Sequence, residues 1–325
     1  MKFQEKIFEF IKPAKTSRGV YTQKSHFKIS ITQDNKTGCG EIAPLPDLSV
    51  DGKVNYTPVL EECHNLSNSD LRDFSEAHIA MYPALNFAVE SAFAQLSETP
   101  SPFKKGKEII INGLVWMDTV DEMLEVAMKK ASEGLRCLKF KVGALDHDSE
   151  CRLIEKVRTA FPNITLRLDA NGGFNFDDAQ HKLKDFNAFQ IHSLEQPIKV
   201  GNWEAMNEIC AKSPIDIALD EELIGVYNQK YPLLKSIKPK YIILKPSLLG
   251  GFSPCDEWIS EAQKLDIDWW ATSALEGNIG LLAIAEWASS YDLSLPQGLG
   301  TGALYKENYP SSLALEKDIL RYKVN

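Results

Sequence analysis

The stretch T-L-R-L-D-A-N-G, residues 165–172, ends an apolar strand pattern in a carboxylate. The apolar run stops at Asp169, and Asn171 follows two residues on, so both side chains lie on one face of an extended chain. Gly172 and Gly173 then break the strand. A carboxylate in this position could cap a helix, bind a metal ion or act as an acid or base. Repetition of the pattern along the chain favours the functional roles.

The pattern recurs on neighbouring segments. Apolar runs also end in a charged residue at Glu195, Asp220 and Lys245, while Lys139 and Lys141 share one face of an upstream strand. Successive charged positions from 141 onward lie 25 to 28 residues apart, with a helical segment in each gap. Units of this length are βα units, which build parallel strands. We therefore predict an α/β fold, a modified TIM barrel of type (β/α)7β. The ends of its strands would bring these charged residues and Asp169 together.

The extent of this βα repeat divides the chain into three predicted regions. Residues 1–105 do not share it, and we expect an α+β capping domain there; residues 106–304 form the barrel, and residues 305–325 form a tail that packs on the capping domain. Loops of the capping domain could cover the mouth of the barrel.

Alternating apolar residues predict two strands near the N-terminus, Lys2–Phe10 and Ser25–Thr32. The polar segment Thr16–Gln23 is predicted to be the loop between them. The last barrel strand is expected at Leu295–Gly302.

Composition narrows the class of protein. The 325 residues carry a formal net charge of −9 without a basic run, which argues against nucleic acid as a partner. The six cysteines show no C-x-x-C spacing and are expected to be reduced thiols of a cytoplasmic protein. The N-terminal segment is too charged for a signal peptide, and no apolar run approaches ~18 residues, so no membrane contact is expected. A small-molecule substrate is the expected partner; the oligomeric state is left open.

The charged set suits a hard cation. Three carboxylates without His or Cys favour oxygen-preferring ions, Mg²⁺ first, with Mn²⁺ as an ion that accepts the same ligands. Glu222 could replace Asp220, because strand alternation would place both on one face. A lysine beside a divalent cation and a second ammonium gives up its proton more readily and can serve as a base. Such a site suits removal of a proton next to a carboxylate.

The motifs L-K-F-K, D-A-N-G, E-Q-P, L-D-E-E and I-L-K-P-S resemble those of the muconate-lactonising subgroup of the enolase superfamily. Segments such as G-E-I-A-P-L-P and W-W-A-T-S-A-L-E-G-N-I-G-L are similar to those of the o-succinylbenzoate synthase family. The resemblance covers most of the chain from Cys39 to Tyr305. It implies a Mg²⁺-dependent dehydration of 2-succinyl-6-hydroxy-2,4-cyclohexadiene-1-carboxylate to 2-succinylbenzoate in menaquinone biosynthesis, through an enediolate that the metal stabilises.

Carried over residue by residue, the resemblance implies that the metal ligands are Asp169, Glu195 and Asp220. It implies Lys141 as the general acid/base, Lys139 as its electrostatic partner, and Lys245 as a cation that holds the ring from the opposite side. The remaining candidates are Ser273, Gly277 and Asn278 near the succinyl carboxylate, Asn171 as an orienting group, and Arg18 with Tyr21 on a covering loop. The free amides of Gly277–Gly280 at a helix start predict an anion site.

Two other functions remain open. The same fold could support an N-acylamino acid racemase or a dipeptide epimerase, with Lys141 and Lys245 as opposed bases. The last strand, Q-G-L-G-T-G, offers no acidic residue for a free amino group, which disfavours dipeptides more than N-acyl substrates. A non-catalytic metal-binding barrel is the third reading, and the presence of every lysine argues against it.

Overall fold

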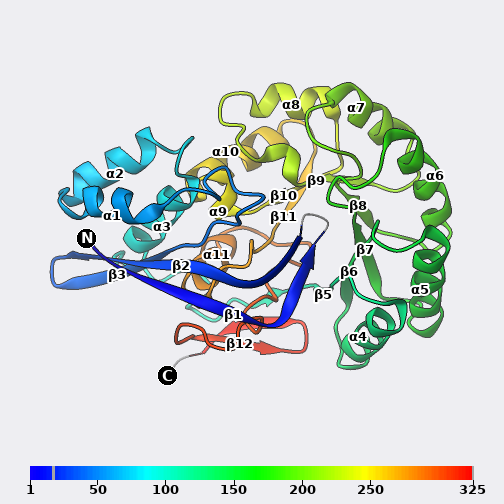
Figure 1. Ribbon diagram of the computed structural model, residues 1–325, viewed down its shortest axis with the longest axis horizontal. Coiled ribbons are helices and arrows are strands. Elements are labelled where there is room, and N and C mark those ends of the chain that lie inside the picture. The colour runs from blue at the N-terminus through cyan, green and yellow to red at the C-terminus, as the bar shows by residue number, and fades with distance from the viewer. Residues whose placement is uncertain (17–18, 324–325) are drawn as a thin grey trace.

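Parallel strands form the centre of the molecule in the computed structural model, which describes residues 1–16 and 19–323 (Figure 1). Within these residues the central sheet has seven strands in the order β11-β10-β9-β8-β7-β6-β5. Their bounds are β5 Gly113–Val115, β6 Cys137–Lys141, β7 Thr165–Asp169, β8 Ser193–Glu195, β9 Ile217–Leu219, β10 Tyr241–Leu244 and β11 Asp268–Ala271. Sequential order and parallel pairing confirm the predicted βα architecture.

The sheet closes through single bridges. Gln297 pairs with Ile111 and Gly298 pairs with Thr272, both in parallel, so this segment lies between β11 and the entry to β5. The predicted strand Leu295–Gly302 is therefore wrong as a regular strand, although it occupies the eighth position. Proline lacks a ladder donor and glycines weaken strands, which accounts for the minimal pairing of L-P-Q-G-L-G-T-G.

Helices follow the strands and cover the outside of the barrel (Figure 1). They are α4 Val120–Ser132, α5 His147–Ala160, α6 Phe176–Asn187, α7 Trp203–Lys212, α8 Lys230–Ile237, α9 Pro246–Leu249, α10 Phe252–Gln263 and α11 Asn278–Ala288. Several begin at a polar side chain that accepts a hydrogen bond from a first-turn amide; Thr119, Asp146 and Asn175 do this for α4, α5 and α6. The local sequence thus marks where each of these helices begins.

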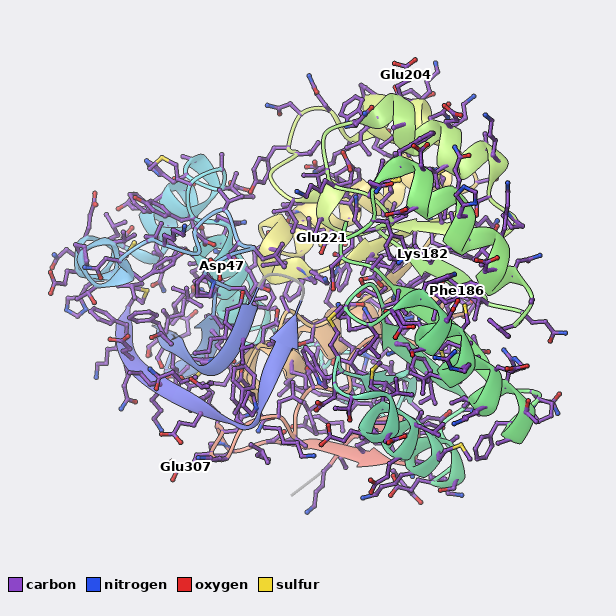
Figure 2. All side chains as sticks on the ribbon, turned by 45° about the vertical axis from the view of Figure 1, so that its right-hand side comes forward. Asp47, Lys182, Phe186, Glu204, Glu221 and Glu307 are labelled. Atoms are coloured by element: carbon purple, nitrogen blue, oxygen red, sulfur yellow. The ribbon has the colours of Figure 1, made fainter. Side chains whose placement is uncertain are left out.

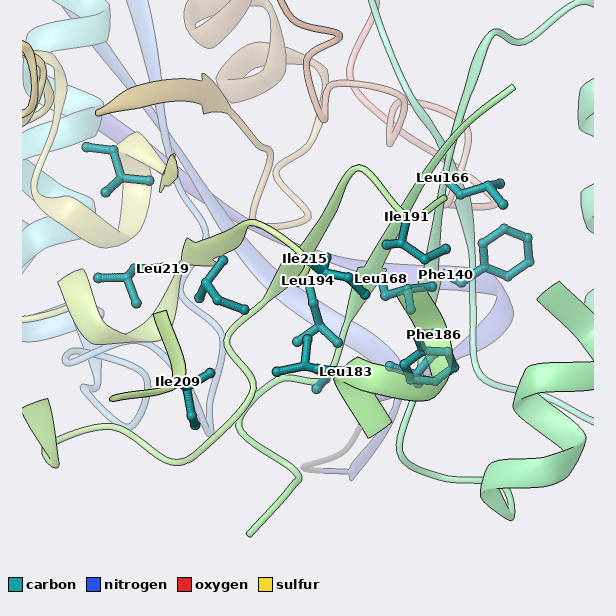
Figure 3. Packing of buried hydrophobic residues seen from close by; sticks show 14 of the residues in the cluster. Phe140, Leu166, Leu168, Leu183, Phe186, Ile191, Leu194, Ile209, Ile215 and Leu219 are labelled. Carbon is teal, nitrogen blue, oxygen red and sulfur yellow. The ribbon is translucent and has the colours of Figure 1, made fainter. Parts of the chain in front are cut away.

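The main core lies between the strands and these helices. Leu166, Leu168 and Leu194 point outward from β7 and β8 and are fully buried, and they pack in one cluster with Leu183 and Phe186 of α6 (Figure 3). Burying one such side chain contributes about 1.5–3 kcal/mol. The opposite faces of the same strands remain available for polar residues.

An antiparallel cap precedes the barrel. Its sheet contains β1 Lys2–Thr16, β2 Gly19–Gln33 and β3 Lys36–Ile42, covered by α1 Tyr56–His64, α2 Asn68–Ala77 and α3 Pro83–Ala94. The predicted polar loop Thr16–Gln23 is wrong: Tyr21 pairs with Ala14, and Gln23 with Glu9. Much of this end of the hairpin is exposed, so it needs no apolar alternation to form strands.

Close packing joins β3 to α3. A Cβ atom at Gly40 would lie 1.9 Å from the carbonyl oxygen of Ala88, and one at Gly38 would lie 1.9 Å from that of Ala92. Only glycine permits this approach of strand to helix.

Residues after the barrel return to both earlier regions. The Ile11 amide donates to the Leu304 carbonyl, the Lys306 amide donates to the Glu9 carbonyl, and Phe10 bridges to Tyr305. Further on, β12 Leu313–Glu316 and β13 Ile319–Tyr322 pair with β4 Ile109–Ile110. None of the helices formed by the described residues is both long and apolar enough to cross a membrane.

Candidate active site

Five neighbouring strands deliver charged side chains to one end of the barrel. Lys141, Asp169 and Glu195 are register partners on β6, β7 and β8. Asp220 directly follows β9, and Lys245 directly follows β10. These groups and Lys139 are at most 9% exposed. The structure thus brings together all six charged residues that the spacing singled out.

The ammonium groups bind the carboxylates directly. Lys139 Nζ lies 3.0 Å from Asp169 Oδ2 and 3.0 Å from Glu195 Oε2. Lys141 Nζ lies 2.5 Å from the same Asp169 oxygen, and Lys245 Nζ donates to Asp220 Oδ2. Lys141 and Lys245 therefore approach the carboxylates from β6 and β10, on opposite sides.

The carboxylates compete for this positive charge. Burial and the neighbouring Asp169 raise the pKa of Glu195 well above its ordinary value, although Lys139 opposes the rise. Burial also acts to raise the pKa of Asp169, but Lys141 and Lys139 outweigh it and hold that pKa below its ordinary value. Burial alone would lower the pKa of Lys245, yet Asp220 and Glu195 raise it. Three buried carboxylates this close demand compensating cations.

The donor chemistry fits a divalent metal ion. The three carboxylates supply only oxygen atoms, the ligands that Mg²⁺ takes in proteins. Among the residues that the structure describes, no three acidic, His or Cys side chains already surround a metal-sized space. The ammonium groups of Lys139, Lys141 and Lys245 instead make the contacts that a cation would make.

Glu222 does not share the face of Asp220. Residues Glu221–Leu223 form a 3-10 turn rather than a strand, so alternation no longer applies. Glu222 accepts hydrogen bonds from the Gly201 amide at 2.8 Å and from Gln196 Nε2 at 3.1 Å. Its carboxylate is committed there, whereas Asp220 faces Lys245.

Asn171 joins the charged groups to the turn after β9. It has a left-handed backbone with φ of 46°, and its backbone N–H donates to Asp169 Oδ1. Its side-chain oxygen accepts from Lys141 Nζ at 2.7 Å, and its Nδ2 donates to Glu221. Figure 2 places Glu221 toward the middle of the molecule, while Lys182 and Glu204 lie on outer helices. Asn171 therefore orients Lys141 as well as Asp169.

A cavity opens beside the lysines. Of the predicted residues, it is lined by Lys139, Lys141, Lys245, Asn171 and Ser273. Sequence reasoning missed the rest of the lining, which includes Leu45, Leu48, Asn112, Leu114, Trp116, Thr272, Ala274, Leu275, Gly300 and Thr301. Leu114 and Trp116 alternate with Val115 of β5, and that alternation was the available signal.

Gly277 and Asn278 are not among these lining residues, and the predicted anion site at the start of α11 is already filled from within the chain. Glu41 of β3 accepts from the amides of Gly277 at 2.6 Å and Gly280 at 2.8 Å. The Asn278 amide donates to Asn308 at 2.9 Å. A buried carboxylate at a helix N-terminus is electrostatically favourable, so a substrate carboxylate would have to displace it.

Of the two candidates on the predicted covering loop, the structure describes Tyr21 alone. Arg18 lies outside the described residues. Tyr21 lies on β2, and its hydroxyl donates to Asp47 at 3.2 Å, on the loop that contributes Leu48 to the cavity.

Comparison with known proteins shows the family of this chain. The family described as "Enolase C-terminal domain-like" matches residues 122–316. The chain is 40% identical to the o-succinylbenzoate synthase of Desulfotalea psychrophila, over 96% of this chain and 95% of that protein. It is 26% identical to the o-succinylbenzoate synthase of Pectobacterium atrosepticum, over 84% of this chain and 81% of that protein.

Solved structures show the same fold. The crystal structure of MenC from Desulfotalea psychrophila superposes with a TM-score of 0.86 at 36% identity and covers 98% of both chains. The L-Ala-D/L-Glu epimerase of Bacillus subtilis superposes with a TM-score of 0.87 at 19% identity, covering 99% of this chain and 95% of that one. The second likeness concerns the fold alone.

Proposed function

The chain belongs to the o-succinylbenzoate synthase family of the enolase superfamily, and from that premise we propose how its residues carry out the reaction. The family activity is that of a hydro-lyase in menaquinone biosynthesis. The cyclohexadiene carboxylate loses one molecule of water and becomes the aromatic 2-succinylbenzoate.

Lys141 is the proposed acid/base. It removes the proton from the ring carbon that bears the carboxylate, and it then protonates the departing hydroxyl group, which leaves as water. One group can serve both steps because the proton that it takes is the proton that it returns. Asn171, which accepts a hydrogen bond from Lys141 Nζ, orients the amine toward the cavity.

Lys139 and Lys245 are the proposed electrostatic partners. Lys139 lies between Asp169 and Glu195 and keeps the buried carboxylates compensated. Lys245, from the opposite strand, presents a cation to the electron-rich ring. Mg²⁺ held by Asp169, Glu195 and Asp220 would supply positive charge to the substrate carboxylate as it gains electron density. Mn²⁺ would satisfy the same oxygen ligands.

One observation carries this proposal: Lys141 and Lys245 line the same cavity from opposite sides of the carboxylates. A planar ring between them would have the base on one face and a cation on the other. This position also permits a two-base racemisation of N-acylamino acids, which is the alternative activity of the same site.

A pair of assays separates these activities. Aromatisation of the cyclohexadiene carboxylate is followed by absorbance, with Mg²⁺ and with EDTA, beside a racemisation assay on N-succinyl amino acids. We expect fast aromatisation that EDTA abolishes and Mg²⁺ restores. Racemisation as the faster reaction would transfer Lys245 to a base role and overturn the proposed assignment.

A further inference from the structure

One wall of the cavity has an unusual backbone. The loop after β11 contributes Ser273, Ala274 and Leu275 to the lining. Leu275 has φ of 63°, in the left-handed region, which is unfavourable for a residue with a Cβ atom. Such conformations persist where surrounding contacts over-determine them, and they concentrate at functional sites.

The contacts that hold this wall come from outside the barrel strands. Lys24 of β2 donates from Nζ to the carbonyl of Leu275 at 2.9 Å and to that of Ala274 at 3.0 Å. The hydroxyl of Tyr305, after the barrel, donates to the same Leu275 carbonyl at 2.6 Å. Two buried side chains, Lys24 and Tyr305, thus donate to the carbonyl oxygen of Leu275. The left-handed backbone of Leu275 sets the direction in which this oxygen points.

The position of Lys24 is costly for folding. The side chain is only 5% exposed, and among the described residues its ammonium donates to these carbonyl oxygens and to no carboxylate. Burial lowers the pKa of Lys24 to about 8, although Glu276, Glu41 and Asp51 lie near enough to oppose the change. A buried cation without a directly bonded anion is often less stable than an apolar side chain of similar size. Stability alone therefore does not account for a lysine here.

We infer that Lys24 and Tyr305 are positioning residues that fix the Leu275 wall of the cavity, and so set which acyl chain the site accepts. In the proposed reaction Lys141 and Lys245 face the reacting ring. The other residues that line the cavity are then left for the groups that do not react, the succinyl chain among them. The inference rests on the proposed function, because it assigns this wall to the substrate of that reaction.

The test replaces Lys24 by methionine, which is unbranched, keeps most of the length of the side chain and removes its hydrogen-bond donors. We expect KM for the succinyl substrate to rise about fivefold to tenfold, as for the loss of about 1 kcal/mol of hydrogen bonding. We expect kcat to fall no more than about threefold. Preference in kcat/KM for the succinyl substrate over its malonyl and glutaryl analogues should fall in parallel, while the melting temperature stays at or above that of the wild type.

Lys28→Met is the matched control, because Lys28 lies four residues along β2 and is half-buried. Equal KM and equal selectivity in the Lys24 and Lys28 variants would overturn the inference. So would a fall in kcat without a change in KM, because Lys24 would then act on the chemistry. If Lys24→Met does not fold, Tyr305→Phe removes the second donor to the same carbonyl and should relax selectivity in the same direction; unchanged selectivity there overturns the inference equally.

Failure of the proposed function gives a different result. Wild-type protein that does not aromatise the cyclohexadiene carboxylate would refute the reaction. Calorimetric binding of 2-succinylbenzoate to the same variants measures the wall without turnover. We expect Lys24→Met to weaken that binding and Lys28→Met to leave it unchanged; equal binding would refute the wall assignment by itself.

Discussion

Replacing Glu41 by glutamine should weaken the contact between the cap and the barrel and lower the stability of the protein. Glu41 is fully buried, and its two carboxylate oxygens accept from the amides of Gly277 and Gly280. His26 Nδ1 lies 2.5 Å from Oε1. Glutamine has the same shape, but it replaces one acceptor by an NH₂ group that faces a backbone N–H.

The magnitude follows from these contacts. A hydrogen bond to a charged group contributes roughly 1.5–3 kcal/mol, and a carboxylate at a helix N-terminus adds roughly 0.3–1 kcal/mol. The substitution removes one such bond, leaves a buried donor unpaired and abolishes the charge. We expect the free energy of unfolding to fall by about 3 kcal/mol at neutral pH.

The pH dependence provides an internal check. Burial acts to raise the pKa of Glu41, but His26 and the two amides lower it more, so the folded value lies below the ordinary 4.5. The stabilisation is then complete above pH 4.5 and is lost as the pH falls through the folded value. The gap between wild type and variant should therefore narrow in acid.

Urea unfolding followed by tryptophan fluorescence and circular dichroism measures this gap. Glu98→Gln is the control, because Glu98 pairs with Lys36 at 2.8 Å on the exposed edge of the cap and should leave stability close to wild type. A Glu41 variant as stable as the Glu98 variant would refute the reasoning, as would a gap that widens in acid.

Three further outcomes follow. Lys141→Ala should lower kcat about 10³-fold or more while the circular dichroism spectrum stays that of the wild type, since both proton steps use this amine; substantial residual turnover would remove Lys141 from that role. Asp169→Asn should weaken Mg²⁺ binding at least about tenfold by calorimetry, and equal affinity would contradict its assignment as a ligand. Gly40→Ala should lower the free energy of unfolding in urea by about 3 kcal/mol, because its Cβ would lie 1.9 Å from the Ala88 carbonyl oxygen. Gly19→Ala, whose Cβ would meet nothing within 4 Å, should leave it unchanged, and equal losses would contradict the packing argument.

Spacing was sufficient to predict the charged end of the barrel. Strand Thr165–Asp169 has the predicted bounds, and the six charged residues converge because parallel strands share one carboxyl end. Periodicity in each βα unit is local, so a single sequence reveals it. The same reasoning did not predict α10, Phe252–Gln263, although it contains five buried residues.

Non-local contacts account for the other errors. The amides that begin α11 looked free because their acceptor, Glu41, lies more than 230 residues earlier in the chain. Glu222 was assigned to the face of Asp220 because a 3-10 turn follows β9 where alternation predicted a strand. Lys24 carried no local signal at all, since its role depends on carbonyl groups about 250 residues away.

The return of residues 304–306 to the edge of β1 has a consequence for synthesis. During translation β1 can pair with β2 early, but the bonds from Ile11 and Glu9 to this segment need a partner made almost 300 residues later. Closing so long a loop is entropically unfavourable until the barrel between its ends has folded. Although β1 is synthesised long before residues 304–306, it is therefore among the last strands to be fully paired, and the cap is completed late in folding.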